Sequence, residues 1–218
     1  DPIKYDVLNA NAYAPVYDYL STMLQTAVIT EQVVMREDFH WEIIPIINHE
    51  DAYAYSMPGG KIVLSTAMLQ YLEHESELLA LLSSEIYFAD VDLHTATLKD
   101  KFSGIRLGSI VLGSDTKNPS DLIDFLREQS FTEEEVAESD RRTISVMCPF
   151  NYDVTSLKGL VDRTKSTKTG VEMTAWNSKR PRPANWQEMF STEEAKCDNA
   201  SSEKFRSRYE SIKSQLPQ

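Results

Sequence analysis

Residues 78–88 read Leu-Leu-Ala-Leu-Leu-Ser-Ser-Glu-Ile-Tyr-Phe, an apolar run that contains two serines and one acid. A helical His-Glu-x-x-His sequence places two imidazoles one turn apart, where both bind one zinc ion, and the glutamate between them acts as general base. In this chain Glu85 stands where that base stands, but Ser84 and Phe88 occupy the two ligand positions. The stretch therefore has the spacing of a catalytic zinc motif without its imidazoles.

The residues before this stretch resemble peptidase family M48. That family has an N-A-F-x-x-P-G-G strand and turn, followed by E-x-E-L-x-x-V-x-x-H-E-x-x-H. Here Pro58-Gly59-Gly60 lies between two apolar segments, and Glu75-x-Glu77-Leu78 leads into the motif at the same mutual spacing. The resemblance marks Glu85 as the relic of a general base that no longer functions.

Three matches to the same family follow further along the chain. Glu138-Ser139-Asp140 corresponds to its E-A-D motif, whose glutamate is the third zinc ligand, Asn151-Tyr152-Asp153 to its G-Y-D-P turn, and Arg180-Pro181 to a His-Pro pair. The resemblance implies an α+β fold of the M48 peptidase-like, zincin type, helix-rich with a small β-sheet. We expect this domain to span residues 1–183, with residues 184–218 as a C-terminal helical tail packed on it or extending from it.

The net charge of −12 is unevenly distributed along the 218 residues. Residues 1–140 hold 25 acidic and 8 basic side chains, and residues 141–218 hold 9 acidic and 14 basic ones. An acidic body argues against nucleic-acid binding, because phosphate contacts require a basic footprint. The basic C-terminal part is able to hold the chain's own acidic body, to hold an acidic partner, or to form a solvated surface.

Composition gives further limits. No run of about 18 apolar residues exists, so no membrane span is expected. Cys148 and Cys197 have no C-x-x-C spacing, and they are able to pair in an oxidising compartment or to remain separate thiols. The chain begins at Asp1 without a methionine, which is compatible with a removed signal or anchor. From the family resemblance we expect an extracytoplasmic location.

Periodicity predicts most helices and strands. Apolar spacing predicts a helix over residues 12–29, another that starts near Ser65 or Thr66, and a longer one from about His74 to Lys99. Strands are expected over residues 40–47, with Pro45 at an edge or bulge, and on both sides of Pro58-Gly59-Gly60.

Later in the chain, Thr132 and Glu135 form a predicted capping box, and further helices fit residues 154–165 and 201–216. Residues 100–118 carry several glycines and predict a mobile loop. Trp176 and Trp186 are expected to pack on the body.

Zinc is not expected in the family's site. Phe88 offers no lone pair, and a serine hydroxyl such as that of Ser84 is a poor zinc ligand, so Glu138 is the only expected ligand of three. A relocated site using Asp90, Asp92 or His94 is disfavoured, because Glu85 and His94 point in opposite directions on a helix. Asp90 and His94, at i and i+4, are expected to form an exposed ion pair.

The sequence therefore predicts a catalytically inactive pseudopeptidase that binds or scaffolds a protein or peptide partner through a protease-shaped cleft. We expect no cofactor. The alternative is an active zinc metalloendopeptidase with a remodelled metal site. The expected peptide-binding edge is the strand after the Pro-Gly-Gly turn, which comprises Lys61, Ile62, Val63, Leu64 and Ser65.

Overall fold

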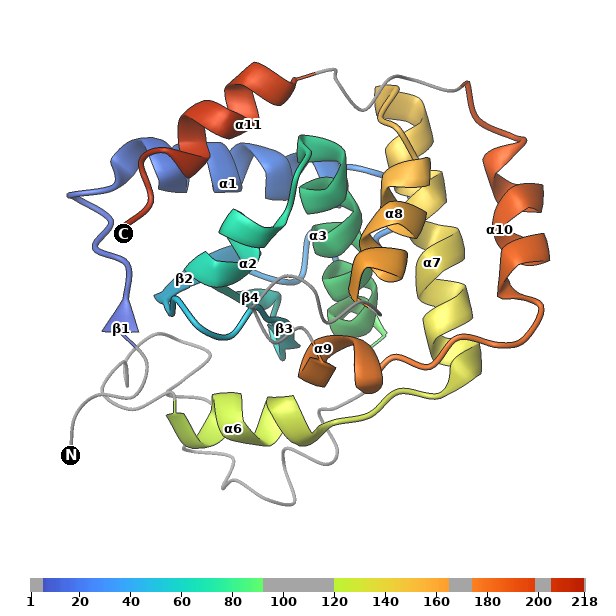
Figure 1. Ribbon diagram of the computed structural model, residues 1–218, viewed down its shortest axis with the longest axis horizontal. Helices are drawn as coiled ribbons and strands as arrows, with labels where there is room; N and C mark the ends of the chain where they lie inside the picture. Colours follow the sequence, from blue (N-terminus) through green and yellow to red (C-terminus); the bar gives the residue numbers. More distant parts are fainter. Residues whose placement is uncertain (1–5, 92–119, 165–173, 199–204, 218) are drawn as a thin grey trace.

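The structure is a computed structural model that describes residues 6–91, 120–164, 174–198 and 205–217 (Figure 1). Its strands and helices are β1 (Asp6–Val7), α1 (Ala14–Val28), β2 (Glu42–Ile47), β3 (Ala54–Met57), β4 (Lys61–Ser65), α2 (Thr66–Tyr71), α3 (Glu75–Asp90), α6 (Ser120–Glu128), α7 (Glu133–Met147), the 3-10 turn η1 (Cys148–Phe150), α8 (Thr155–Thr164), α9 (Thr174–Ser178), α10 (Trp186–Glu194) and α11 (Arg206–Lys213). The predicted α+β class, helix-rich with one small sheet, is confirmed.

The sheet has four strands in the order β1-β2-β4-β3. β4 pairs in parallel with β2 and antiparallel with β3, so Lys61–Ser65 lies in the interior of the sheet. The prediction that this strand is a peptide-binding edge is wrong, because both of its sides already have ladder partners. Lys61 is buried and pairs with Glu42 of the neighbouring strand. The edge next to β4 is β3.

Pro45 lies in β2, which has β1 on one side and β4 on the other, so the prediction of an edge position is also wrong. The ring removes one donor, but the carbonyl of Pro45 still accepts a bond of 2.9 Å from the Leu8 N–H. The turn between β3 and β4 is as predicted. Gly59 and Gly60 have φ of 78° and 84°, a region that glycine enters without steric cost.

The predicted helices lie near their expected positions, whereas α6, α9 and α10 were not predicted individually. α1 covers most of residues 12–29, and α2 begins after Ser65, whose hydroxyl accepts the Met68 N–H. Both bonds of the capping box at Thr132 and Glu135 are present at the start of α7. α3 ends at Asp90, with Val91 as its C-cap, so it is shorter than the predicted helix up to Lys99. The predicted loop at residues 100–118 lies outside the described residues.

α3 runs through the centre of the molecule, and all of its 16 residues are buried (Figure 1). It contacts α1, α7 and α8 as well as β3 and β4. Burial on every side removes the apolar side chains of α3 from water. It also means that the carboxylates on α3 need partners inside the protein, because a buried charge without one is costly.

Carboxylates on α3 bind arginines from the basic C-terminal part. Glu77 accepts two bonds from Arg163, one of them of 2.7 Å. Glu75 accepts bonds from Arg208 and from the hydroxyls of Tyr19 and Tyr152. These contacts give the uneven charge of the chain a structural role, because its basic part binds its own acidic body.

Asp90, at the C-terminal end of α3, is also a buried carboxylate beside an arginine. It accepts bonds from the Val34 and Met35 N–H groups and lies 3.6 Å from Arg142. Its side chain is 2% exposed, so the predicted exposed ion pair does not describe it. Its predicted partner, His94, lies outside the described residues.

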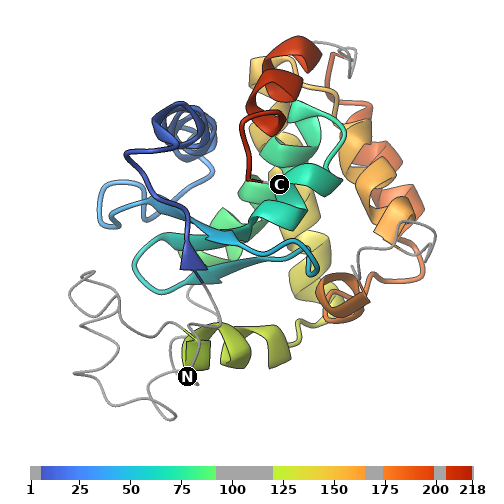
Figure 2. The same cartoon turned by 60° about the vertical axis from the view of Figure 1, so that its left-hand side comes forward.

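The C-terminal helices share the core of the body. Buried side chains of α10 and α11 join the apolar cluster that also contains α1 and α3 (Trp186, Phe190, Tyr209, Ile212). α11 contacts α1, from which it is far in sequence. Figure 1 shows the two helices along one another, and Figure 2 shows α1 end-on. The division between residues 183 and 184 stays a prediction.

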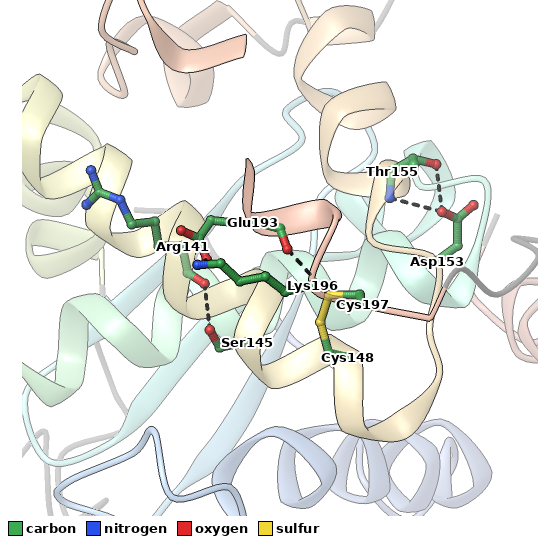
Figure 3. Close-up of a disulfide and its surroundings, with 8 residues drawn as sticks. All are labelled: Arg141, Ser145, Cys148, Asp153, Thr155, Glu193, Lys196 and Cys197. Carbon is green, nitrogen blue, oxygen red and sulfur yellow. Dashed lines mark hydrogen bonds and ion pairs between the residues drawn. A yellow bond between two sulfur atoms is a disulfide. The ribbon is translucent and has the colours of Figure 1, made fainter. Parts of the chain in front are cut away.

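A disulfide joins Cys148, at the end of α7, to Cys197, just after α10, with 5.3 Å between the two Cα atoms. Figure 3 shows it between the two segments, with Glu193 and Lys196 alongside. The sequence left open whether these cysteines form a disulfide or remain separate thiols, and in the structure they form the disulfide. The bond closes a loop that contains Arg163, Arg180 and Arg182.

Replacing Arg163 by Met should lower the free energy of unfolding by about 3–5 kcal/mol, because Glu77 is left buried without a counter-ion. Urea unfolding measures this. Lys196→Met, at an exposed pair with Glu193, is the matched control and should change stability by at most about 0.5 kcal/mol. Adding Glu77→Gln to Arg163→Met should restore part of the lost stability, because no unpaired carboxylate is then buried. Equal effects of Arg163→Met and Lys196→Met would contradict the structural role of the pair.

Candidate functional site

Glu85 lies fully buried in α3, on the side that faces β3. One carboxylate oxygen accepts the Ser56 N–H at 2.9 Å. The other accepts a bond of 2.6 Å from Arg180 and is 3.5 Å from the indole nitrogen of Trp176. Both carboxylate oxygens thus accept hydrogen bonds from protein donors.

Arg180 comes from the segment that links α9 to α10. We call residues 174–186 the strap. The strap is held by a main-chain bond of 2.9 Å from the Phe131 N–H to the Lys179 carbonyl and by an ion pair of 2.8 Å between Arg182 and Asp140. The Trp186 indole also donates to Asp140 at 2.7 Å. Arg180 is consequently fixed over α3 and is only 3% exposed.

The pair of Glu85 and Arg180 also occupies the outer edge of β3. In an antiparallel ladder alternate residues direct their main-chain groups away from the partner strand. On β3 the Ser56 N–H meets Glu85, and the Ala54 carbonyl lies 3.4 Å from Arg180. α6 also contacts β3. The carboxylate and the guanidinium thus take the acceptor and donor positions that an added peptide strand would use.

The two positions of the missing imidazoles are filled by packing and by a hydroxyl pair. The ring of Phe88 stacks on Phe131, with centroids 3.9 Å apart. The hydroxyl of Ser84 lies 2.8 Å from that of Ser139 on α7. Both side chains are buried, so the volume beside Glu85 is closed by protein atoms.

Glu138 does not face this volume, contrary to the prediction that made it the remaining ligand. Its carboxylate binds Arg141 and Arg142 on the outer side of α7, and its side chain is 40% exposed. Helical geometry explains the difference, because Val136 and Ser139 lie on the side of α7 that faces α3. Val136 packs in one cluster with Phe88 and Phe131.

Burial raises the pKa of the Glu85 carboxyl, while Arg180 and the bonds from Ser56 and Trp176 lower it. Burial likewise raises the pKa of Asp140, against the lowering effects of Arg182 and Trp186. Glu85 therefore has a cation directly beside it, the guanidinium of Arg180.

The residues present do not fit a zinc ion. At the positions that correspond to the ligands, Ser84 is bonded to Ser139, Phe88 is stacked, and Glu138 points away. In the part of the chain that the structure describes, no three His, Cys, Asp or Glu side chains come together as a metal site. The guanidinium of Arg180 places a positive charge next to Glu85, which opposes a second cation there.

A model of peptidase family M48 matches residues 18–87. The matched segment runs from α1 to α3 and contains Ser84 and Glu85. No curated protein matches the chain. The predicted resemblance to the M48 peptidase family is confirmed over these residues. None of the described helices is long and apolar enough to cross a membrane.

Sequence reasoning located Glu85, Ser84 and Phe88 but missed most of what surrounds them. Arg180 stood out only as the counterpart of a His-Pro pair, although the surplus of arginines after residue 140 was a usable signal. Val136 and Phe131 carried no signal of their own, since apolar residues beside a helix start are common core residues. Only the packing of α7 on α3 brings them to the site.

Introducing both imidazoles, Ser84→His with Phe88→His, should not create a tight zinc site, because Glu138 faces outward and Arg180 stays beside Glu85. Loss of the Phe88 ring should cost roughly 1–3 kcal/mol of stability. Elemental analysis of the folded double variant measures the zinc content. About one zinc per chain would show that Glu138 or another group turns inward and that the site assignment is wrong.

Proposed function

We propose that this protein is a catalytically inactive pseudopeptidase of the M48 type, which acts by binding or scaffolding another protein rather than by cleaving it. The pairing of Glu85 with Arg180 carries the proposal. A general base needs a lone pair within reach of the water that it activates. The Glu85 carboxylate instead accepts bonds from Ser56 and Arg180 and has the Trp176 indole nitrogen 3.5 Å away, which opposes its use as a base.

The filled ligand positions support the same proposal. Zinc catalysis of peptide hydrolysis requires three protein ligands and an open position for water. Phe88 and Phe131 fill this space with stacked rings, and the Ser84 and Ser139 hydroxyls satisfy each other. Activity would therefore require the removal of both an aromatic pair and a buried arginine.

The binding part of the proposal rests on what the fold retains. The described part of the domain keeps a four-stranded sheet beside α3, and the edge of β3 keeps the main-chain directions of a strand that can accept another. In this structure the chain's own side chains satisfy those groups. A partner would have to displace them or bind elsewhere on the surface.

The disulfide between Cys148 and Cys197 supports an extracytoplasmic location, because disulfides persist in oxidising compartments and are rare in the cytosol. We propose such a location for this protein.

The purified protein should hold no stoichiometric zinc and should not cleave unfolded protein substrates, with or without added zinc. Elemental analysis and a casein degradation assay test this. Glu85→Gln is the control, because any proteolysis that remains in that variant comes from a contaminant. One zinc per chain together with proteolysis that Glu85→Gln abolishes would overturn the proposal.

Alkylation without reductant should leave both cysteines unmodified in protein isolated under conditions that trap thiols, and two alkyl groups should appear after reduction. Intact mass measures both states. Alkylation at Cys148 and Cys197 before reduction would contradict the proposed oxidising location.

A further inference from the structure

Four aromatic rings surround the guanidinium of Arg180. Its central carbon lies 4.6 Å from the ring centre of Trp176, 5.0 Å from Phe131, 5.7 Å from Phe88 and 6.0 Å from Tyr55. A cation within about 6 Å of an aromatic face is attracted by the ring quadrupole, and the attraction grows when water is excluded. With the Glu85 carboxylate at 2.6 Å, these rings form an arginine cage.

Most of this cage belongs to the body of the protein and not to the strap. Tyr55 is on β3, Glu85 and Phe88 are on α3, and Phe131 precedes α7. Burial raises the pKa of Tyr55 to about 12, so its ring is neutral at physiological pH. Only Trp176 arrives with the strap. Most of the groups around the guanidinium thus come from other segments than the strap that carries Arg180.

We propose that this cage is a binding site for an arginine side chain of a partner protein, which the chain keeps closed with its own Arg180. The inference rests on the proposed function, since it makes the closed site of the pseudopeptidase its binding site. The carboxylate and the Ala54 carbonyl accept hydrogen bonds in the plane of a guanidinium, and the rings cover its faces. This combination selects arginine over lysine.

The contact made by Arg180 is incomplete, which makes exchange physically reasonable. Its Nε is buried and has no hydrogen-bond partner among the residues that the structure describes, and the bond to the Ala54 carbonyl is long, at 3.4 Å. A buried donor without an acceptor weakens a contact, and the desolvation of a buried ion pair offsets much of its attraction. A partner's arginine with better geometry is thus able to compete with Arg180.

Displacing Arg180 would also open the edge of β3. The Ala54 carbonyl loses a donor when Arg180 leaves, and the Ser56 N–H stays next to Glu85. An extended segment that carries the incoming arginine is then able to bond to the edge through its main chain. The partner class that fits both features is an extended protein segment containing an arginine.

The test uses the full chain with Arg180→Ala and the probe ethylguanidinium. The small cation should raise the melting temperature of this variant with a saturable dose response, because it binds only the folded state. Ethylurea, a neutral analogue of the same shape, should give no saturable rise. Ethylammonium should bind about tenfold more weakly or worse, since it lacks the planar fork.

Glu85→Gln added to Arg180→Ala is the matched control, and it should abolish the response. Arg182→Ala is a second control, because it removes a neighbouring strap arginine and leaves the cage occupied by Arg180. A response of equal size with ethylurea, or one that persists in the Glu85→Gln combination, would overturn the cage. If Arg180→Ala does not fold alone, ethylguanidinium and not ethylurea should restore folding, and failure of both to do so would also overturn it.

The partner class is tested with two peptides on Arg180→Ala, Gly-Gly-Arg-Gly-Gly and the same peptide with citrulline in place of arginine. The arginine peptide should bind and the citrulline peptide should not, as measured by calorimetry. Binding of ethylguanidinium without binding of the arginine peptide would overturn the assignment of a protein partner. Neither outcome depends on zinc or proteolysis, so failure here leaves the proposed inactivity of the site untouched.

Discussion

The structure depends on the neutralisation of buried carboxylates by arginines. Glu75, Glu77, Glu85 and Asp90 all lie on α3 and are buried, and each contacts an arginine from the C-terminal part of the chain (Arg208, Arg163, Arg180 and Arg142). A buried ionised carboxylate without a partner would cost several kcal/mol. The central helix therefore becomes stable only after the chain beyond residue 140 has packed around it, so the folding of the two parts is coupled.

This coupling explains why the C-terminal segments, although polar in sequence, are parts of the folded body. The strap contributes Arg180 and Arg182, α8 contributes Arg163, and α11 contributes Arg208. Apolar anchors accompany them, as Trp186 and Tyr209 join the core. The disulfide of Cys148 with Cys197 ties the end of α10 to the end of α7 and shortens the loop that has to be ordered for these contacts.

The sequence predicted what depends on local chemistry and failed where tertiary pairing decides. The capping box at Thr132, the Pro-Gly-Gly turn and the course of α1 follow from residues close in sequence, and all three were predicted. The edge position of residues 61–65 was wrong, because strand order is set by pairing with β2, which lies earlier in the chain. The prediction that Glu138 faces the site was wrong, because this residue lies on the outer side of α7. A motif match does not show which side of a helix a residue takes. The hydrogen-bond partner of Glu85 was missed because Arg180 is 95 residues away in the sequence.

At the site, Arg180 supplies a positive charge beside Glu85, as a metal ion would, but it supplies none of a metal ion's coordination chemistry. A zinc ion beside a glutamate supplies positive charge, an open coordination position and an activated water molecule. Arg180 supplies the charge and a fixed set of donors, and it has no coordination position that a water molecule could enter. The stacked rings of Phe88 and Phe131 complete this replacement, because they remove the polar volume that a water molecule would need. The features that support the proposed inactivity also enclose the Arg180 guanidinium between a carboxylate and aromatic rings. The proposed recognition of a partner's arginine rests on the same enclosure, because in-plane acceptors and rings over the faces suit a guanidinium better than an ammonium.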